Sequence, residues 1–187
     1  NWNKILTPQN TFSIKTKIQS DIIQKSNFCT MKSKDAIVDR IRKEKNSRPS
    51  IDKRNPDFYI FIYIKNKKIK VFLNSSGWPL FMRGYRTKIH KAALNESLAA
   101  GILKLTNWNK DDALYDPFCG SGTFLIEGAM DALNIPPRIL RNFYAFKNWK
   151  NFNTELWNQI IEEEQNNIIN KKINLYGSDL INQNIEL

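Results

Sequence analysis

Apolar and polar positions follow two different periods along this chain, and each period predicts a different element. In the first half, residues 58–64 are apolar on both faces and rich in β-forming side chains, which predicts a central buried strand. The polar turn 65–68 and the following run 69–73 predict its hairpin partner. Residues 11–15 alternate between apolar and polar side chains, as a half-exposed strand does.

A helix is predicted over residues 32–42, with Ser33 as its N-cap. Four side chains at helical spacing share one face of it: Ala36, Ile37, Arg40 and Ile41. Pro49 then pushes the residues before it towards extended backbone and marks a break. One helix combined with antiparallel strands predicts a small α+β module in this half of the chain.

The second half is organised around residues 116–123, which read Asp-Pro-Phe-Cys-Gly-Ser-Gly-Thr. The apolar run 113–115 predicts a buried strand before them, and apolar residues at helical spacing over 124–133 predict a helix after them. The helix is expected to end at the Asn-Ile-Pro-Pro segment 134–137, because proline cannot continue the helical hydrogen bonds. Strand, glycine turn and helix in this order predict the opening of a nucleotide-binding α/β unit.

Further elements of an α/β arrangement are predicted around this unit. Helices are expected over residues 91–103, from Thr154 and from Asn182, and residues 173–176 predict a second strand. Asp179 comes just past the end of that strand, where the ribose hydroxyls of a bound nucleotide lie in such sheets. We therefore expect Asp179 and the glycine turn to belong to one ligand site.

The glycine turn is compatible with more than one ligand. A dinucleotide fingerprint needs a third glycine where Leu125 stands, and an acidic residue about 20 positions further on, whereas no acid follows a strand before Asp179. A phosphate loop needs Lys directly after Gly122, and none is present. A turn that merely connects strand and helix is the plainest alternative. The Phe-x-Gly-x-Gly pattern with Asp116 at the strand end instead resembles motif I of S-adenosylmethionine-dependent methyltransferases.

Charge adds a partner to this picture. The chain has a formal net charge of +11. Residues 1–91 hold 21 Lys and Arg against 6 Asp and Glu, whereas residues 92–187 hold 8 against 12. Positive charge concentrated in this way favours nucleic acid, because each neutralised phosphate releases counterions. Arg83 and Arg86 flank Tyr85, so this segment could clamp a phosphate beside a stacked base, or could be an interdomain linker anchored by Tyr85.

Other kinds of chemistry have little support in the sequence. Cys29 and Cys119 have no CxxC spacing, which argues against a disulfide framework or a zinc site and fits a reducing intracellular compartment, cytoplasm or organelle. His90, the single histidine, is expected at the surface or in packing. The aromatic residues of 143–152 could stack bases, although a small core beneath a connection is favoured. Residues 162–164 predict a solvated helix side and no metal site, and no apolar run is long enough to cross a membrane.

Several short blocks of this sequence resemble a known family. In the first half, blocks similar to the end of the THUMP region of THUMP-linked RNA methyltransferases are residues 34–40, 48–52, 76–80 and 83–86. In the second half, blocks similar to the methyltransferase domain that follows are residues 96–100, 116–123, 126–130 and 134–137. The chain is most similar to the bacterial large-subunit rRNA guanine-N2 branch, and next to the tRNA guanine-N2 branch.

The resemblance implies a fold, a cofactor and a partner. The fold would be the start of a Rossmann-like class I methyltransferase sheet over residues 86–187, preceded by part of a small α+β THUMP-like module over residues 1–85. S-adenosylmethionine would be the methyl donor, and a structured RNA, rRNA or tRNA, would present a guanine flipped out of its stack. The implied cofactor-binding residues are Asp116, Phe118, Cys119, Gly120, Ser121, Gly122, Thr123, Asp179 and Leu180. The residues predicted to bind RNA are Lys32, Lys34, Arg42, Lys43, Arg48, Arg83 and Arg86.

The sequence departs from the family pattern in one respect that concerns catalysis. The family's catalytic Asn/Asp-Pro-Pro-Tyr/Phe motif follows the second strand, whereas residues 134–137 follow the first helix and cannot replace it. The THUMP region of the family also begins earlier. We therefore expect an internal fragment without a catalytic residue and without turnover, in which Cys119 lines the cofactor loop or packs and is not a nucleophile.

Alternative functions are a tRNA guanine-N2 methyltransferase, an adenine-N6 enzyme, a non-catalytic RNA-binding protein with a degenerate methyltransferase fold, and a nicotinamide oxidoreductase. Leu125 and the basic first half disfavour the last of these.

Overall fold

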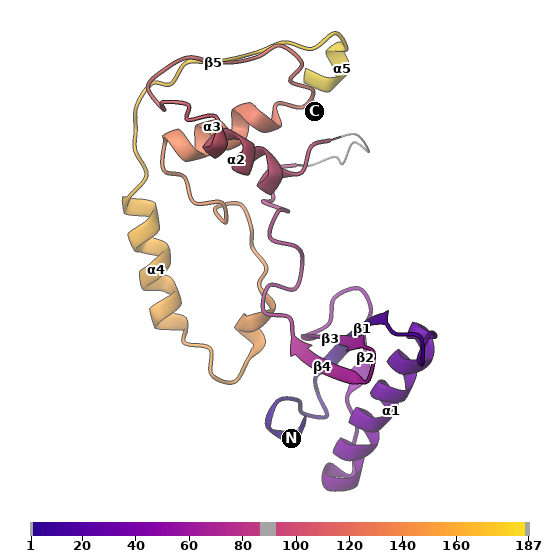
Figure 1. The fold of residues 1–187 in the computed structure, drawn as a ribbon. Helices are drawn as coiled ribbons and strands as arrows, with labels where there is room; N and C mark the ends of the chain where they lie inside the picture. The colour runs from indigo at the N-terminus through magenta and orange to yellow at the C-terminus, as the bar shows by residue number, and fades with distance from the viewer. Residues whose placement is uncertain (1, 87–92, 186–187) are drawn as a thin grey trace. The chain divides into compact units, whose positions relative to one another are not determined.

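A computed structural model describes residues 2–86 and 93–185 of the chain (Figure 1). The chain forms two compact units, each of which contains two stretches of sequence. Unit 1 comprises Asn1–Gly77 and Phe143–Phe152, and unit 2 comprises Trp78–Asn142 and Asn153–Leu187. His90 lies outside the described residues, so its predicted place at the surface or in packing stays a prediction.

Unit 1 is built on a four-stranded sheet with the order β2-β1-β3-β4. After a short 3-10 turn, η1 (Trp2–Lys4), the elements in chain order are β1 (Thr11–Gln19), α1 (Ser26–Lys45), β2 (Ser50–Ile51), β3 (Phe58–Lys65) and β4 (Lys68–Leu73). The strands β1 and β3 are parallel, and β3 and β4 form the predicted antiparallel hairpin. The expected module is therefore present, but β1 is parallel to both of its neighbours: α1 crosses over from β1 to β2 at the sheet edge, and the chain then continues to β3 on the other side of β1.

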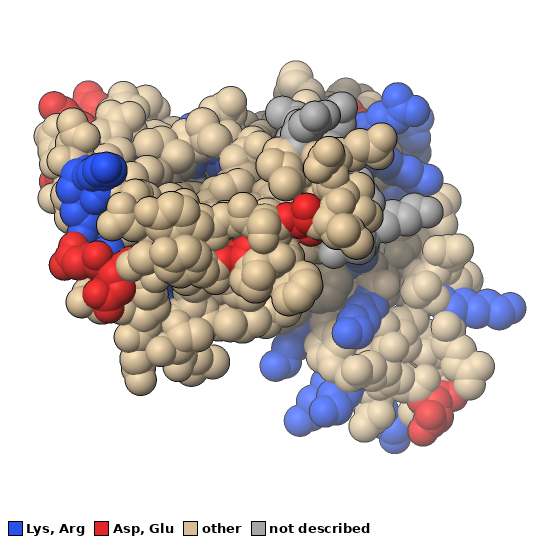
Figure 2. Space-filling view, turned by 90° about the horizontal axis from the view of Figure 1, so that it is seen from above, with Lys and Arg blue, Asp and Glu red and all other residues tan. Residues whose placement is uncertain are grey.

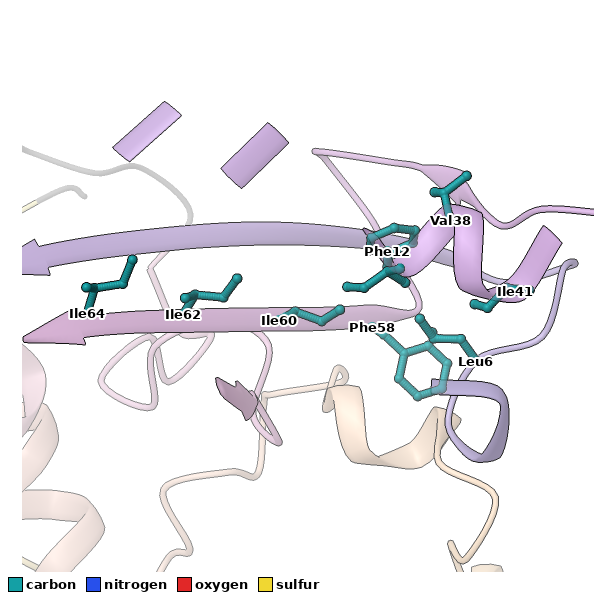
Figure 3. Close-up of a cluster of buried hydrophobic side chains, with 9 residues drawn as sticks. Leu6, Phe12, Val38, Ile41, Phe58, Ile60, Ile62 and Ile64 are labelled. Atoms are coloured by element: carbon teal, nitrogen blue, oxygen red, sulfur yellow. The ribbon is translucent and has the colours of Figure 1, made fainter. Parts of the chain in front are cut away.

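The core of unit 1 lies between α1 and one face of this sheet (Figure 3). Alternate residues of β3, among them Ile60 and Ile62, are buried on that face together with Phe12 of β1. Ile41 of α1 packs into the same cluster. Such alternation shows that β3 is half-covered, because successive side chains of a strand point to opposite faces.

Helix α1 differs from the prediction at its beginning. It starts at Ser26, and Lys25 in the N-cap position makes no side-chain hydrogen bond, so the prediction that Ser33 caps the helix is wrong. The extra turns are stabilised by tertiary contacts. Cys29 packs against the apolar cluster, and the hydroxyl of Thr30 hydrogen-bonds that of Thr16 in β1 at 2.8 Å.

The aromatic segment 143–152 belongs to unit 1, although it lies far from the rest of that unit in the sequence. It contains a short 3-10 helix, η2 (Ala145–Asn148), whose Phe146 amide donates to Ser75 O at 2.9 Å. Phe143 contacts Tyr59 of β3 edge-to-face, with ring centroids 6.1 Å apart. The expected small aromatic core is confirmed, and it packs on the β3 sheet.

Unit 2 contains a two-stranded parallel sheet that positions the glycine loop. Its elements in chain order are α2 (Glu96–Leu105), β5 (Leu114–Asp116), α3 (Thr123–Ala132), α4 (Thr154–Asn166), β6 (Leu175–Gly177) and α5 (Asn182–Ile185). In the register of β5 and β6, Asp116 lies opposite Gly177. The strand–loop–helix order and the α/β fold class are confirmed, and β5 and β6 overlap the predicted strands 113–115 and 173–176. The prediction that the first of these strands is buried is wrong, because Tyr115 is largely exposed.

Two helices of unit 2 begin with an asparagine cap. Asn95 accepts from the Leu98 amide at the start of α2, and Asn153 accepts from the Leu156 amide at the start of α4. The first helix therefore starts later than residue 91, where the sequence pattern placed it. Among residues 2–86 and 93–185, no helix has the length and apolar character needed to cross a membrane.

Candidate functional site

The glycine loop of residues 116–123 connects the end of β5 to the beginning of α3. Gly120 has φ of 53° and Gly122 has φ of 74°, a left-handed backbone that residues with a side chain rarely adopt. Within the described part of the chain, no atom lies within 4 Å of where a Cβ would stand at either glycine. The backbone conformation therefore favours glycine at both positions, and the space beside the loop stays open.

The loop is fastened to the carboxyl end of β6 by backbone hydrogen bonds. The Cys119 amide donates to Ser178 O at 2.9 Å, and the Ser178 amide donates to Asp116 O at 3.0 Å. The approach is so close that a Cβ on Gly177 would lie 2.5 Å from Leu125 Cδ1 and 3.1 Å from the Cys119 side chain. A side chain at Gly177 would therefore require Leu125 and Cys119 to shift, so the glycine allows the loop to lie this close to β6.

Asp179 extends this attachment with its side chain. Its Oδ2 accepts from the Gly120 amide at 2.9 Å, and its Oδ1 accepts from the Ile181 amide at 2.9 Å and from Asn184 Nδ2 at 3.0 Å. These hydrogen bonds, the one from Ile181 most strongly, hold the pKa of the Asp179 carboxyl below its usual value. Asp179 is therefore an ionised group that ties the glycine loop to the segment after β6.

A pocket of about 370 Å³ lies beside the loop. Its lining includes six of the nine residues predicted to bind the cofactor: Asp116, Phe118, Cys119, Gly120, Ser121 and Thr123. It also includes four residues that the sequence analysis did not single out: Ala93, Leu94, Phe124 and Asn184. Gly122, Asp179 and Leu180 are not in the lining; Asp179 supports the loop, and the Leu180 side chain is 99% exposed. No sequence motif could have predicted that Ala93, Leu94 and Asn184 line this pocket.

The pocket combines a negative side chain with a helix N-terminus. Asp116 stands at the end of β5, and its Oδ1 accepts from the Phe118 amide at 3.2 Å. The first turn of α3 begins at Thr123, and the amide groups of a first helical turn have no intrahelical acceptor. Such a pocket can take a ligand with a cationic group near Asp116 and polar oxygens near the start of α3.

The thiol of Cys119 is not activated in this site. Burial raises its pKa, and the negative charges of Asp116 and Asp179 raise it further. A nucleophilic cysteine needs a lowered pKa, because the thiolate is the reactive form. The electrostatics therefore agree with the expectation that Cys119 lines the loop without acting as a nucleophile.

The segment with Arg83, Tyr85 and Arg86 is engaged in buried contacts within unit 2. The guanidinium of Arg83 pairs with the buried carboxylate of Glu127, with Nε 3.4 Å from Oε1. The Tyr85 hydroxyl donates to the same Glu127 Oε1 at 3.1 Å, and burial raises the pKa of Tyr85 far above its usual value. Tyr85 thus anchors this segment, as one of the two sequence interpretations expected.

Arg86 connects the same segment to the glycine loop. Its Nη1 lies 3.0 Å from Oε1 of buried Glu96, and its Nη2 donates to Thr123 Oγ1 at 2.5 Å and to Leu94 O at 2.7 Å. Thr123 and Leu94 line the pocket. Both guanidinium groups already pair with buried carboxylates, so Arg83 and Arg86 stabilise unit 2 in this structure. We therefore leave these two residues, which were predicted to clamp a phosphate, out of the RNA surface proposed below.

The remaining residues predicted to bind RNA lie on α1 and just after it. Lys32, Arg42, Lys43 and Arg48 are exposed, and Lys34 is half-buried. Acidic residues alternate with them. Lys34 pairs with Asp35 at 2.7 Å, and Arg42 lies 3.8 Å from Asp39. Figure 2 shows that Lys and Arg side chains clearly outnumber Asp and Glu at the lower right of that view.

No group of His, Cys, Asp and Glu side chains suited to hold a metal ion occurs in the ranges 2–86 and 93–185. The fold and the site define a class: an α/β ligand-binding unit with a methyltransferase-type glycine loop, joined to a basic α+β module. The chain belongs to the RMKL-like methyltransferase family, whose methyltransferase-domain profile matches residues 83–187. A THUMP domain profile matches residues 1–74. The predicted domain boundary after residue 85 stays a prediction.

Curated relatives agree with this membership. The chain is 41% identical over 190 residues to ribosomal RNA large subunit methyltransferase K/L of Psychromonas ingrahamii, with 100% of the chain and 25% of the relative covered. It is 36% identical over 166 residues to the protein of the same name from Buchnera aphidicola, covering 88% of the chain and 24% of the relative. The chain thus spans about a quarter of the length of these relatives.

Solved structures share the fold over the whole chain. A putative methyltransferase, SMU.472, was crystallised as a complex with SAH; it is 28% identical, with a TM-score of 0.84 over 100% of this chain and 49% of that one. A possible methylase from Clostridium difficile is 30% identical, with a TM-score of 0.82 over 100% and 49% of the two chains.

Proposed function

We propose that this chain is part of an S-adenosylmethionine-dependent RNA methyltransferase that modifies guanine-N2 of large-subunit rRNA. The observation that supports the proposal most is the pocket beside the glycine loop, built by residues 116–123 and fastened to Asp179. The names of the curated relatives support rRNA as the substrate. Guanine-N2 rests on the family resemblance, and the RNA-binding role of unit 1 rests on its THUMP match and its positive charge.

The residues present suit S-adenosylmethionine. A volume of about 370 Å³ lies within the range of roughly 300–1,000 Å³ that is typical of small-molecule sites. The Asp116 carboxylate would attract the amino group or the sulfonium of the cofactor, and the first turn of α3 would face its polar oxygens. When bound, the cofactor supplies a methyl group activated by the positive sulfur.

The other groups of the site would position this ligand. Asp179 would hold the ribose, as the resemblance implies, while it keeps the Gly120 amide in place. Asn184 would add an amide to the lining, and Arg86 would hold Thr123 and Leu94 at the pocket wall. The chain would thus bind and orient the cofactor. This role does not require any residue of the chain to gain or lose a proton.

Unit 1 would bring the RNA to this site. Its lysine and arginine side chains would neutralise phosphates, a contribution to affinity that weakens as salt rises. Lys32, Lys34, Arg42, Lys43 and Arg48 would contribute to this surface from α1 and the turn after it. Replacing Lys32, Lys34, Arg42 and Lys43 together by Gln is expected to weaken RNA binding and to flatten its salt dependence, as measured by fluorescence anisotropy between 50 and about 200 mM salt.

The experiment that tests the cofactor site is a calorimetric titration of S-adenosylhomocysteine into the 187-residue chain. Asp116→Asn removes the charge but keeps an oxygen that can accept from the Phe118 amide, and we expect about 10- to 100-fold weaker binding. Asp179→Ala removes the hydrogen bond to the loop and is expected to abolish binding. Asp112→Ala, an exposed acid of the same unit, is the matched control and should bind like the parent chain.

The readout is binding, so it does not depend on a catalytic motif. No heat of binding from a chain that is folded by circular dichroism would contradict the proposal. Equal binding by Asp116→Asn and the parent chain would contradict the electrostatic role of Asp116 and leave the pocket itself supported.

A further inference from the structure

The sheet of unit 1 has a second face, opposite α1, that carries aromatic and basic side chains. Because side chains alternate along a strand, residues next to the buried Ile60, Ile62 and Ile64 point to this open face. The aromatic and basic residues of this face on the three long strands are Lys15 and Lys17 of β1, Tyr59, Phe61, Tyr63 and Lys65 of β3, and Lys68, Lys70 and Phe72 of β4. We call these nine residues the open sheet face.

The register places rings beside rings and lysines around them. Phe61 lies opposite Phe72, and their ring centroids are 6.2 Å apart. Tyr63 lies opposite Lys70 on one side and Lys17 on the other. Each of the three long strands thus contributes to a continuous aromatic and basic strip across the sheet.

The two ends of the open sheet face differ in how they are covered. At one end Tyr59 packs against Phe143 of the aromatic segment. At the other end a hollow of about 690 Å³ is lined by Tyr63, by four lysines of the β3–β4 hairpin, and by the residues that follow β1. Phe72 is 46% exposed between these ends, although a ring of this size is normally buried. The uncovered part therefore combines exposed ring surface with a basic hollow.

The lysines here differ from those of α1 in their partners. Lys65, Lys67, Lys68 and Lys70 line the hollow, and Asp21 is the one acidic residue in its lining. In the part of the chain that the structure describes, no ion pair involves any of these four lysines. On α1, by contrast, three of the cations pair with neighbouring acids. The hairpin lysines thus leave their charge available for a polyanion.

We propose that the open sheet face binds a single-stranded segment of the RNA, with bases stacked on Phe72 and Phe61 and phosphates held by the hairpin lysines. The inference rests on the proposed function, which supplies RNA as the partner. Single strands are favoured over duplexes because a ring can stack only on a base whose face is free, while a duplex conceals the faces of its bases. On α1 a single exposed ring, Phe28, lies beside Lys32 and no pair of neighbouring rings is present in the described part of the helix, so the α1 cations would contact phosphates whether the RNA is paired or not.

The first test uses the 187-residue chain, a fluorescent oligouridine of about ten nucleotides, and an RNA duplex as the second ligand. Phe72→Ala is expected to weaken oligouridine binding about 5- to 100-fold, because base–aromatic stacking contributes that much per base. Phe72→Trp should restore it, and duplex binding should change by less than about twofold in both variants. Val71→Ala, an exposed apolar residue on the other face of β4, is the matched control and should leave both affinities unchanged.

The second test separates the charges of the two surfaces. Replacing the three hairpin lysines Lys65, Lys68 and Lys70 together by Gln should lower the slope of log affinity against log salt concentration for oligouridine by about 2. Each phosphate contact contributes roughly 0.7 to this slope for single strands. Replacing Lys32, Arg42 and Lys43 by Gln removes the same number of charges from α1. This variant should lower the slope for oligouridine and for duplex alike.

The outcomes separate this inference from the proposed function. If Phe72→Ala weakens binding of the oligouridine but not of the duplex, and Phe72→Trp restores it, the result supports binding of single-stranded RNA by the open sheet face. Equal loss for oligouridine and duplex, or no loss, overturns it, and an effect of the α1 variant would then still support RNA binding by unit 1. If neither RNA binds to a folded chain, both the inference and the RNA part of the proposed function are wrong, whatever the titration with S-adenosylhomocysteine shows.

Discussion

The two units of this chain are stabilised in different ways. Unit 1 has a continuous apolar core, in which Phe12 and Ile41 are fully buried between the sheet and α1. In unit 2, the buried apolar residues among those described are Ala99, Leu103 and Ala132, whereas its buried polar residues are Glu96, Thr123, Glu127 and Arg141. Rings that would be expected inside lie outside: Tyr115 and Tyr176 stack on each other at 4.7 Å, and Tyr115 is 69% exposed.

This difference indicates which perturbations each unit should resist. Burial of apolar area involves no ionisable group, so pH changes it little and unit 1 offers a stable frame for a charged outer surface. A buried ion pair gains little in net stability, but it becomes costly when one partner is lost, because the other charge stays unpaired. Unit 2 should therefore be the unit that responds to single polar substitutions, to pH and to bound ligand.

Phe12→Ala is expected to give the largest loss and to confine it to unit 1. Removing a fully buried phenyl group leaves a cavity, at a cost of about 3–5 kcal/mol in the free energy of unfolding. Urea unfolding measures the loss of stability, and hydrogen exchange at the amides of β1 and β3 shows whether the loss lies in unit 1. Binding of S-adenosylhomocysteine to unit 2 should persist in this variant; its loss would contradict the separation of the two units.

Arg86→Ala is expected to destabilise unit 2 by about 3 kcal/mol, because it leaves the Glu96 carboxylate buried without its cation. It should also weaken binding of S-adenosylhomocysteine, since Arg86 holds two residues of the pocket wall. Adding Glu96→Gln should recover part of the stability, because a neutral amide costs less to bury.

The matched control for this substitution is Arg42→Ala, which removes an arginine from an exposed pair on α1 and should cost less than about 1 kcal/mol. Thermal unfolding of all four chains gives the comparison. If both arginine variants lose the same stability, the contrast between buried and exposed pairs is wrong.

Gly177→Ala is expected to displace the glycine loop while leaving unit 1 intact. The added Cβ would lie 2.5 Å from Leu125 Cδ1 and 3.1 Å from the Cys119 side chain, so the Leu125 side chain must rotate and Cys119, inside the loop, must shift by a few tenths of an ångström. We expect at least 10-fold weaker binding of S-adenosylhomocysteine, or about 1.4 kcal/mol, by calorimetry. Gly101→Ala is the control: no described atom lies within 4 Å of the added methyl group, and Ala in helix α2 should raise stability by up to about 1 kcal/mol.

The smallest expected effect is the pH dependence of the loop attachment. The pKa of Asp179 is lowered in the folded chain, so the folded state binds fewer protons than the unfolded state as the pH falls towards the ordinary value of about 4. The stabilisation is present at neutral pH and is lost as the pH falls from there through the folded pKa. The protection factor of the Gly120 amide, which is its exchange rate by NMR relative to the intrinsic rate at the same pH, should fall between neutral pH and about pH 3. Asp179→Ala removes both acceptor oxygens and should show a low protection factor at every pH, whereas a protection factor equal to that of the parent chain would show that the carboxylate does not protect the loop.

Local patterns in the sequence predicted the elements well where neighbours along the chain decide the structure. The hairpin β3–β4, the strand before Asp116 and the helix after Thr123 were all expected, because alternation, a polar turn and paired glycines act within a few residues. The start of α1 was missed for the opposite reason. Its first turns have no cap and depend on contacts of Cys29 and Thr30 with the sheet, which no local pattern contains.

The site was divided in the same way. The sequence alone determined the ligand loop, since left-handed positions such as those at Gly120 and Gly122 favour glycine whatever surrounds them. Only the tertiary structure decided that Arg83 and Arg86 face buried carboxylates, that Asp179 supports the loop, and that Phe72 stands on an open face. These outcomes depend on which residues, distant in the sequence, meet in space. The sequence gives the charge or aromatic character of a side chain, but it does not tell whether that side chain faces a partner or the solvent.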